Sequence, residues 1–202
     1  MAIRIEKTFR VEEPAEKVWA LLSDPRKVAT CVPGAQITEQ IDDKNYKGAI
    51  KVKVGPSSNE FKGELQVLKL DAQTHELEIM GKGQDVRGKG SASMKMTGKL
   101  NAVDGGTEVV STSELNVVGI LAQMGARVIT EVSNIMFEQF VNNFKKQLQA
   151  PDGAAVEAAK PIGGVGLAFS ALKASFSRHD DKSDSSSDPE KSDLAKLDPG
   201  TK

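Results

Sequence analysis

The sequence predicts an α+β fold in which a seven-stranded antiparallel sheet wraps around one long C-terminal helix. Three observations support this prediction. The first eleven residues alternate between apolar and charged side chains, as a half-buried strand does. Residues 35–118 form a succession of strand-like segments separated by turn residues, which indicates an antiparallel meander. Residues 120–148 contain no proline, and their apolar residues recur at helical spacing.

Two short amphipathic helices are expected directly after the first strand. Pro14 ends the strand and suits the first turn of a helix that stops near Ser23. Asp24 and Pro25 begin a second helix, because Asp is a favoured N-cap and Pro is tolerated at position N1. The pair at 33–34, Pro-Gly, ends that helix.

The meander carries turn residues at 42–45, 55–58, 71–74 and 104–106. Its alternating glycines, Gly81, Gly83, Gly88 and Gly90, resemble a phosphate loop only superficially, because no helix N-terminus follows them. Glycines within strands instead allow a sheet to bend sharply.

The helix predicted at 120–148 must cross the sheet, since no other segment could cover so much apolar sheet surface. A strand, two short helices, a six-strand meander and one long helix together make a helix-grip arrangement. We assign this domain to residues 1–149. Residues 150–178 are interpreted as a linker with a short amphipathic segment, and residues 179–202 as a disordered, acidic, Ser-rich tail.

Composition excludes several classes of function. The net charge is -1 over 202 residues, and aromatic residues make up only 4%, so no nucleic-acid partner is expected. Cys31 is the sole cysteine and cannot form an intramolecular disulfide. The two histidines, His75 and His179, lack a partner at metal-ligand spacing. Neither a secretory apolar core nor a membrane-spanning stretch is present, so we expect a cytoplasmic protein.

An apolar cavity is predicted beside the start of the long helix. Met94 and Met96 should lie on a strand that faces small helix residues, and methionine adapts to varied ligands. The alternative is that each methionine simply fills the core. The proposed lining residues are Trp19, Leu22, Cys31, Met94, Met96, Val117, Leu121, Met124, Gly125, Val128 and Val132, with Thr30 and Arg127 as candidate head-group contacts.

Several motifs resemble the CoxG family of carbon monoxide dehydrogenase subunits, which belongs to the START-like (SRPBCC) superfamily. They are Val18-Trp19-Ala20-Leu21-Leu22, Cys31-Val32-Pro33-Gly34-Ala35, Val52-Lys53-Val54-Gly55-Pro56, Gly105-Gly106-Thr107-Glu108 and Val118-Gly119-Ile120-Leu121-Ala122-Gln123-Met124-Gly125. The resemblance covers residues 1–149 and implies a partner, a molybdenum-containing hydroxylase of the carbon monoxide dehydrogenase type. It also implies a link to the cytoplasmic membrane through a quinone (menaquinone or ubiquinone) held in the cavity.

The leading hypothesis is therefore a non-catalytic accessory protein, without a covalently bound cofactor, that carries a small lipophilic ligand. Phe169, Leu172 and Phe176 are candidates for contact with the partner enzyme or with the inner face of the cell membrane. One alternative is an enzyme of the cyclase or hydratase type, which would need convergent acids and bases. The other is a structural adaptor without a cavity.

Overall fold

A computed structural model describes residues 1–54 and 57–150. The strands are β1 (Ala2–Val11), β2 (Ala35–Gln40), β3 (Asn45–Val54), β4 (Ser57–Asp71), β5 (Glu76–Asp85), β6 (Gly90–Val103) and β7 (Gly106–Gly119). The helices are α1 (Ala15–Leu22), α2 (Pro25–Cys31), α3 (Ile120–Gln123) and α4 (Gly125–Gln149).

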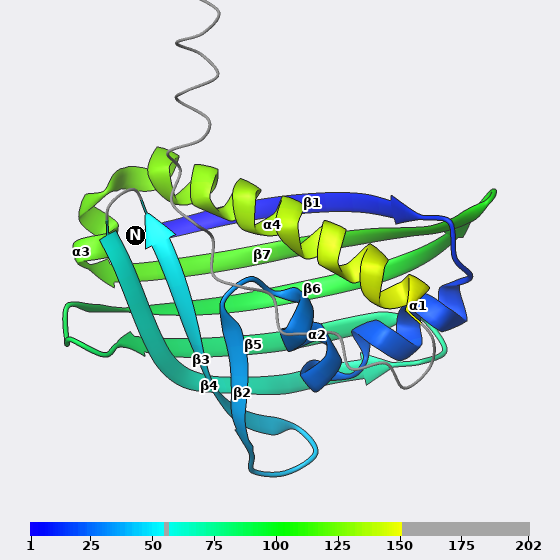
Figure 1. Cartoon of the computed structure of the whole chain (residues 1–202), viewed down its shortest axis with the longest axis horizontal. Coiled ribbons are helices and arrows are strands. Elements are labelled where there is room, and N and C mark those ends of the chain that lie inside the picture. Colours follow the sequence, from blue (N-terminus) through cyan, green and yellow to red (C-terminus); the bar gives the residue numbers. More distant parts are fainter. Residues whose placement is uncertain (55–56, 151–202) are drawn as a thin grey trace, which may run out of the picture. The chain divides into compact units, whose positions relative to one another are not determined.

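The strands form one seven-stranded sheet in the order β1-β7-β6-β5-β4-β3-β2, which confirms the predicted meander. Every neighbouring pair is antiparallel, and β1 joins the sheet by pairing with the last strand, β7. Figure 1 shows α4 running diagonally over the sheet, from α3 at one end to α1 at the other. We refer to the sheet face that meets α4 as the inner face and to the opposite one as the outer face.

The long helix differs from its prediction at its N-terminal end. Instead of one helix over 120–148, α3 ends at Gln123 and α4 begins at Gly125, with Met124 as a turn between them. Gly125 has a φ of +83°, which interrupts a right-handed helix and which glycine adopts at little cost. The prediction of one unbroken helix over 120–148 is therefore wrong at Gly125.

The two short helices after β1 form as predicted. Asp24 caps α2: its Oδ1 accepts hydrogen bonds from the backbone N–H groups of Arg26 (2.9 Å) and Lys27 (3.4 Å), and Pro25 occupies the first helical position. The packing of α1 and α2 against α4 brings these helices onto the inner face.

The hydrophobic core lies where the C-terminal part of α4 meets α1, α2 and the sheet. Phe9 on β1 makes edge-on ring contacts with Phe137, Phe140 and Phe144 of α4, with centroids 5.7–6.1 Å apart. We refer to the buried cluster as the closed half of the inner face: Val11, Val18, Leu21, Cys31, Leu100, Val109, Phe144 and Leu148.

Residues 151–202 lie outside the described residues, so the linker, the tail, Phe169, Leu172 and Phe176 remain as predictions. Gly55 and Pro56 lie outside them too. In the part of the chain that the structure describes, no helix combines the length and apolar character needed to cross a membrane.

Candidate functional site

The inner face continues past the closed half into a region where apolar side chains stay partly exposed. Strand register places them in two adjacent rows across the sheet. One row joins Leu115, Met94, Gly81 and Leu65, and the next joins Ser113, Met96 and Ile79. On β6, Met94 and Met96 stand an even number of positions from Leu100 and therefore share its face. The other residues of the two rows lie in register with Met94 or Met96 across the sheet and share the same face. We refer to the half-buried set as the open half: Leu65, Ile79, Gly81, Met94, Met96 and Leu115.

Gly81 shows that there is space above the open half. A Cβ built on Gly81 would meet no heavy atom within 4 Å. The corresponding Cβ on Gly98, two rows nearer the closed half, would lie 3.1 Å from the Leu77 side chain. A small side chain therefore fits freely at Gly81, whereas Gly98 is already packed.

Some predicted lining residues lie at this end of the molecule. Met94 and Met96 lie on the inner face of β6, as predicted. Val117, two positions beyond Leu115 on β7, is 2% exposed. Of the predicted residues on the helices, Leu121, Met124 and Val132 are half-buried, whereas Val128 is 39% exposed.

Trp19, Leu22 and Cys31 instead belong to the other end of the inner face. Cys31 is part of the closed half, and Trp19 and Leu22 pack against it. Along β6 the closed half begins at Leu100, four residues or about 13 Å beyond Met96. Burial raises the pKa of the Cys31 thiol, so it stays protonated near neutral pH. The structure therefore groups these three residues with the core and apart from the methionines.

The two predicted head-group residues lie on α2 and α4. The Thr30 hydroxyl donates a 2.7 Å hydrogen bond to the Lys27 carbonyl, which occupies its proton. Arg127 is an exposed residue of α4. Their role as head-group contacts stays a prediction.

A polar residue that the sequence prediction missed lies on the inner face. Lys7 on β1 is half-buried, its Nζ donates a hydrogen bond to Asn134 Oδ1 of α4, and it lies 5.3 Å from the centre of the Phe137 ring. Lys7 stands in the same alternating series as Ile5 and Phe9, so period two already placed it on the inner face. The signal was present in the sequence.

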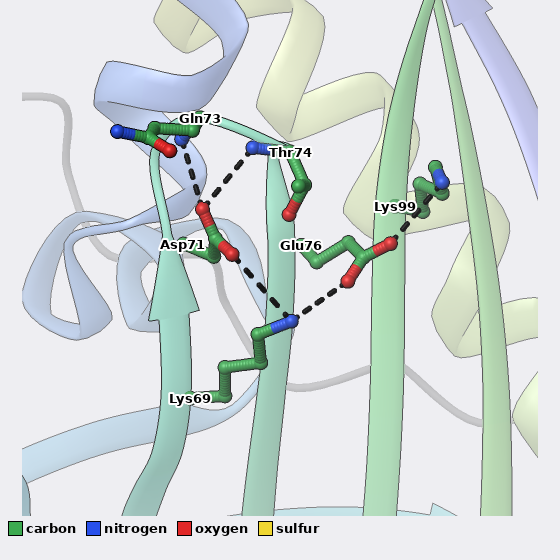
Figure 2. A network of polar contacts seen from close by, with 6 residues as sticks. All are labelled: Lys69, Asp71, Gln73, Thr74, Glu76 and Lys99. Carbon is green, nitrogen blue, oxygen red and sulfur yellow. Dashed lines mark hydrogen bonds and ion pairs between the residues drawn. The ribbon is translucent and has the colours of Figure 1, made fainter.

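The outer face carries a hollow of about 300 Å³, lined mainly by charged and threonine side chains of β4–β7. Figure 2 shows the ionic network beside it: Lys69 Nζ lies 2.8 Å from Glu76 and 3.6 Å from Asp71, and Lys99 lies 3.1 Å from Glu76. Hydrogen bonds from Lys69 and then Lys99 hold the pKa of Glu76 below its usual value. Because these charges neutralise one another in solvent, the hollow is a weaker candidate than the open half.

A metal site is also a weaker candidate. Within residues 1–54 and 57–150, no group of three or more His, Cys, Asp or Glu side chains could hold a metal ion. The candidate site is an apolar surface with the Lys7 ammonium group near its edge. Such a surface can hold a nonpolar molecule and orient its polar end.

Comparison with solved structures shows relatives of the same architecture. A conserved protein from Geobacillus kaustophilus superposes with a TM-score of 0.66 at 18% identity, covering 73% of this chain and 95% of that one. The Zhui aromatase/cyclase from Streptomyces sp. R1128 superposes with a TM-score of 0.56 at 16% identity, covering 77% of this chain and all (100%) of that one. At these identities the likeness concerns the fold alone. No curated protein sequence matches the chain.

The family comparison is more specific. Residues 8–149, most of the chain and nearly all of its described part, match the family of CoxG, a subunit of carbon monoxide dehydrogenase. This match agrees with the helix-grip architecture and with the motifs around α1, α2 and α3. The chain belongs to the CoxG family of carbon monoxide dehydrogenase subunits, whose name implies association with that enzyme.

Proposed function

We propose that this protein is a non-catalytic accessory protein of a molybdenum-containing hydroxylase of the carbon monoxide dehydrogenase type. In this proposal it carries a quinone or similar lipid on the open half and links the enzyme to the cytoplasmic membrane and the respiratory chain. One observation carries the proposal: apolar side chains around Gly81 remain half-buried, and a Cβ added at Gly81 would meet no heavy atom within 4 Å. The family match supports the partner.

The physical argument is one of burial. Each methylene transferred from water onto an apolar surface gains about 0.8 kcal/mol, so one isoprene unit gains roughly 3–4 kcal/mol before other costs. A lipid in a bilayer already has that gain. The protein can therefore exchange the lipid with a membrane only if its own apolar surface matches the bilayer and polar contacts hold the head group.

The chemistry of the open half supports carriage rather than catalysis. Its side chains are those of leucine, isoleucine and methionine, which neither donate nor accept protons in the way that acid–base chemistry requires. An aromatase/cyclase with the same fold makes a cyclase the natural competing function. That alternative would need several titratable groups converging on the bound molecule, and the six residues of the open half include none.

Lipid analysis of the purified full-length protein tests the proposal. Protein expressed in a quinone-producing host would be extracted with organic solvent and the extract analysed by mass spectrometry. We expect a quinone in a molar ratio approaching one per chain, and rebinding of decylubiquinone after delipidation. Protein that retains no lipid and fails to bind added quinone would favour the structural adaptor. Conversion of an added polyketide would favour the cyclase.

Co-purification tests the partner separately. The tagged protein would be mixed with a purified hydroxylase of the carbon monoxide dehydrogenase type, and complex formation measured by size-exclusion chromatography. We expect a complex with this hydroxylase and none with an unrelated flavoprotein. Because this experiment requires no lipid, it distinguishes failure of the partner assignment from failure of the ligand assignment.

A further inference from the structure

Lys7 is the one lysine that β1 directs toward the inner face. Its neighbours in the alternation, Ile5 and Phe9, are apolar and half-buried, and Phe9 packs on three phenylalanine rings of α4. The Lys7 ammonium group therefore lies between the sheet and α4, with Asn134 Oδ1 as its hydrogen-bond acceptor and the Phe137 ring beside it.

Both of these partners are neutral. Within residues 1–54 and 57–150, no carboxylate lies within ion-pair distance (4.0 Å) of Lys7, although nine such pairs form elsewhere. Removing a cation from water is unfavourable unless its donors are satisfied, and an ammonium group has three N–H donors. Asn134 accepts from one of them, and the Phe137 ring offers a weaker cation–π contact.

The position of Lys7 relates it to the open half. Lys7 pairs with Ser111, and the next inner row along the strands contains Ile5, Ser113 and Met96. Lys7 therefore stands one row from a row of the open half, beside phenylalanine side chains of β1 and α4. The Ser113 side chain lies in that row and adds a hydroxyl beside Met96.

We propose that Lys7 is the head-group recognition residue of this surface. Its ammonium group donates a hydrogen bond to an acceptor oxygen of an amphipathic ligand, whose apolar part lies over Met96 and Ile79. Either the ring carbonyl of a quinone or the carboxylate of an acyl lipid supplies such an oxygen. This inference rests on the proposed carrier function and adds to it the residue that determines specificity for the polar end.

A purely structural role is the competing explanation, because the Lys7–Asn134 hydrogen bond also ties β1 to α4. The two explanations differ in what they predict for ligands with and without an acceptor oxygen. A purely structural hydrogen bond shapes the site and therefore affects the binding of all ligands equally. A recognition residue affects only those ligands that carry the acceptor.

The experiment compares three probes, decylubiquinone, decylbenzene and lauric acid, by equilibrium dialysis with wild-type protein, Lys7→Met and the control Lys62→Met. Lys62 is an exposed residue of β4 on the opposite face. We expect Lys7→Met to weaken binding of decylubiquinone, lauric acid or both by about 10- to 100-fold, as the loss of a hydrogen bond from a charged donor does. Decylbenzene binding should stay unchanged, and Lys62→Met should resemble wild type with every probe.

The pattern of losses identifies the head group. A selective loss with decylubiquinone indicates a quinone carbonyl, and a larger loss with lauric acid indicates a carboxylate; both support the inference. Equal loss of all three probes would show a structural clamp, and no loss would show that Lys7 takes no part; either overturns it. Wild-type protein that binds none of the probes would instead refute the carrier function itself.

A measurement on wild-type protein keeps the inference testable should Lys7→Met fail to fold. Lysine acetylation by acetic anhydride would be followed by mass spectrometry with decylubiquinone or decylbenzene bound, and Lys62 would serve as internal control. We expect decylubiquinone to protect Lys7 at least several-fold more than decylbenzene does, with no change at Lys62. Equal protection by both probes would contradict the assignment.

Discussion

The two halves of the inner face share strands β6 and β7 but differ in how deeply their side chains are buried. In the closed half, Phe144 and Val18 are both 0% exposed. In the open half, Met94, Met96 and Ile79 remain half-buried, and Gly81 faces free space. Strand pairing continues through both regions, so the difference arises from what covers the sheet.

Helix packing explains the difference. The aromatic residues Phe137, Phe140 and Phe144 belong to the second half of α4, where Phe9 meets them, and α1 and α2 pack at α4 too. The first turns of α4 carry Gly125 and Ala126, which have little side chain to place over the sheet. The closed half therefore stabilises the fold, whereas the open half leaves apolar side chains partly exposed. This division predicts that truncating a side chain costs more in the closed half than at an exposed position outside it.

The largest contrast is expected between two residues of the same helix. Phe144→Ala removes a fully buried ring and should lower the free energy of unfolding by about 3–5 kcal/mol. Val128→Ala, at a position 39% exposed, should cost less than about 1 kcal/mol. Urea unfolding followed by circular dichroism measures both. Similar losses at the two positions would show that burial in the closed half adds no stability.

A buried hydroxyl at the end of the closed half should have the next largest effect. Thr107 is 0% exposed, and its hydroxyl donates a 2.7 Å hydrogen bond to the Glu13 carbonyl, which ties β7 to the segment before α1. Thr107→Val keeps the shape and should cost about 1–3 kcal/mol, because the carbonyl loses its partner. Thr97→Val, at an exposed outer-face position, is the control. We expect little change there, and an equal change at both sites would contradict the assigned role of the Glu13 bond.

Substitutions at Gly125 and Gly81 distinguish the energetic cost of backbone strain from the cost of steric overlap. A Cβ at either position would meet nothing within 4 Å, but only Gly125 has a positive φ, +83°. Gly125→Ala should therefore cost about 1–2 kcal/mol from backbone strain alone, and Gly81→Ala should be neutral or slightly stabilising. Thermal unfolding of the two variants measures the difference. A neutral Gly125→Ala would show that α3 and α4 are not separated by a left-handed residue.

The smallest effect is expected on the outer face, where Glu76 accepts hydrogen bonds from Lys69 and Lys99. These bonds lower the pKa of the Glu76 carboxyl in the folded protein. A lowered folded-state pKa means stabilisation that is present above the unfolded-state pKa and lost as the pH falls through the folded one. Glu76→Gln should therefore reduce stability slightly at neutral pH and low salt, and not at all in strong acid. A loss that persists in strong acid would refute this account.

Sequence periodicity predicted most of this fold because its signals are local. The alternation in β1, the N-cap at Asp24 and the turns at 42–45, 71–74 and 104–106 each follow from a few neighbouring residues and are confirmed. Ser57 and Ser58, which were predicted as turn residues, belong to β4. The break before α4 was missed because Gly125 fits the apolar helical pattern equally well in a right-handed or a left-handed conformation. Periodicity reports which face a residue occupies and not its φ angle.

The candidate site was predicted less completely than the fold. Met94 and Met96 were placed correctly on the inner face, but Trp19, Leu22 and Cys31 proved to belong with the core. Their separation depends on which strand residues α1 and α2 cover, which is a long-range property. Lys7 was missed for a different reason: it is the one charged residue in an alternating series that is otherwise apolar.

The central claim is that the space at Gly81 holds a ligand, and the most direct measurement is decylubiquinone binding to Gly81→Leu. The control is Lys82→Leu, the next residue on β5, which is exposed on the outer face. We predict that Gly81→Leu unfolds within about 1 kcal/mol of wild type, because its side chain enters free space, and binds decylubiquinone at least tenfold more weakly. Lys82→Leu should bind normally. A Gly81→Leu variant that folds normally and binds decylubiquinone as tightly as wild type would contradict the claim.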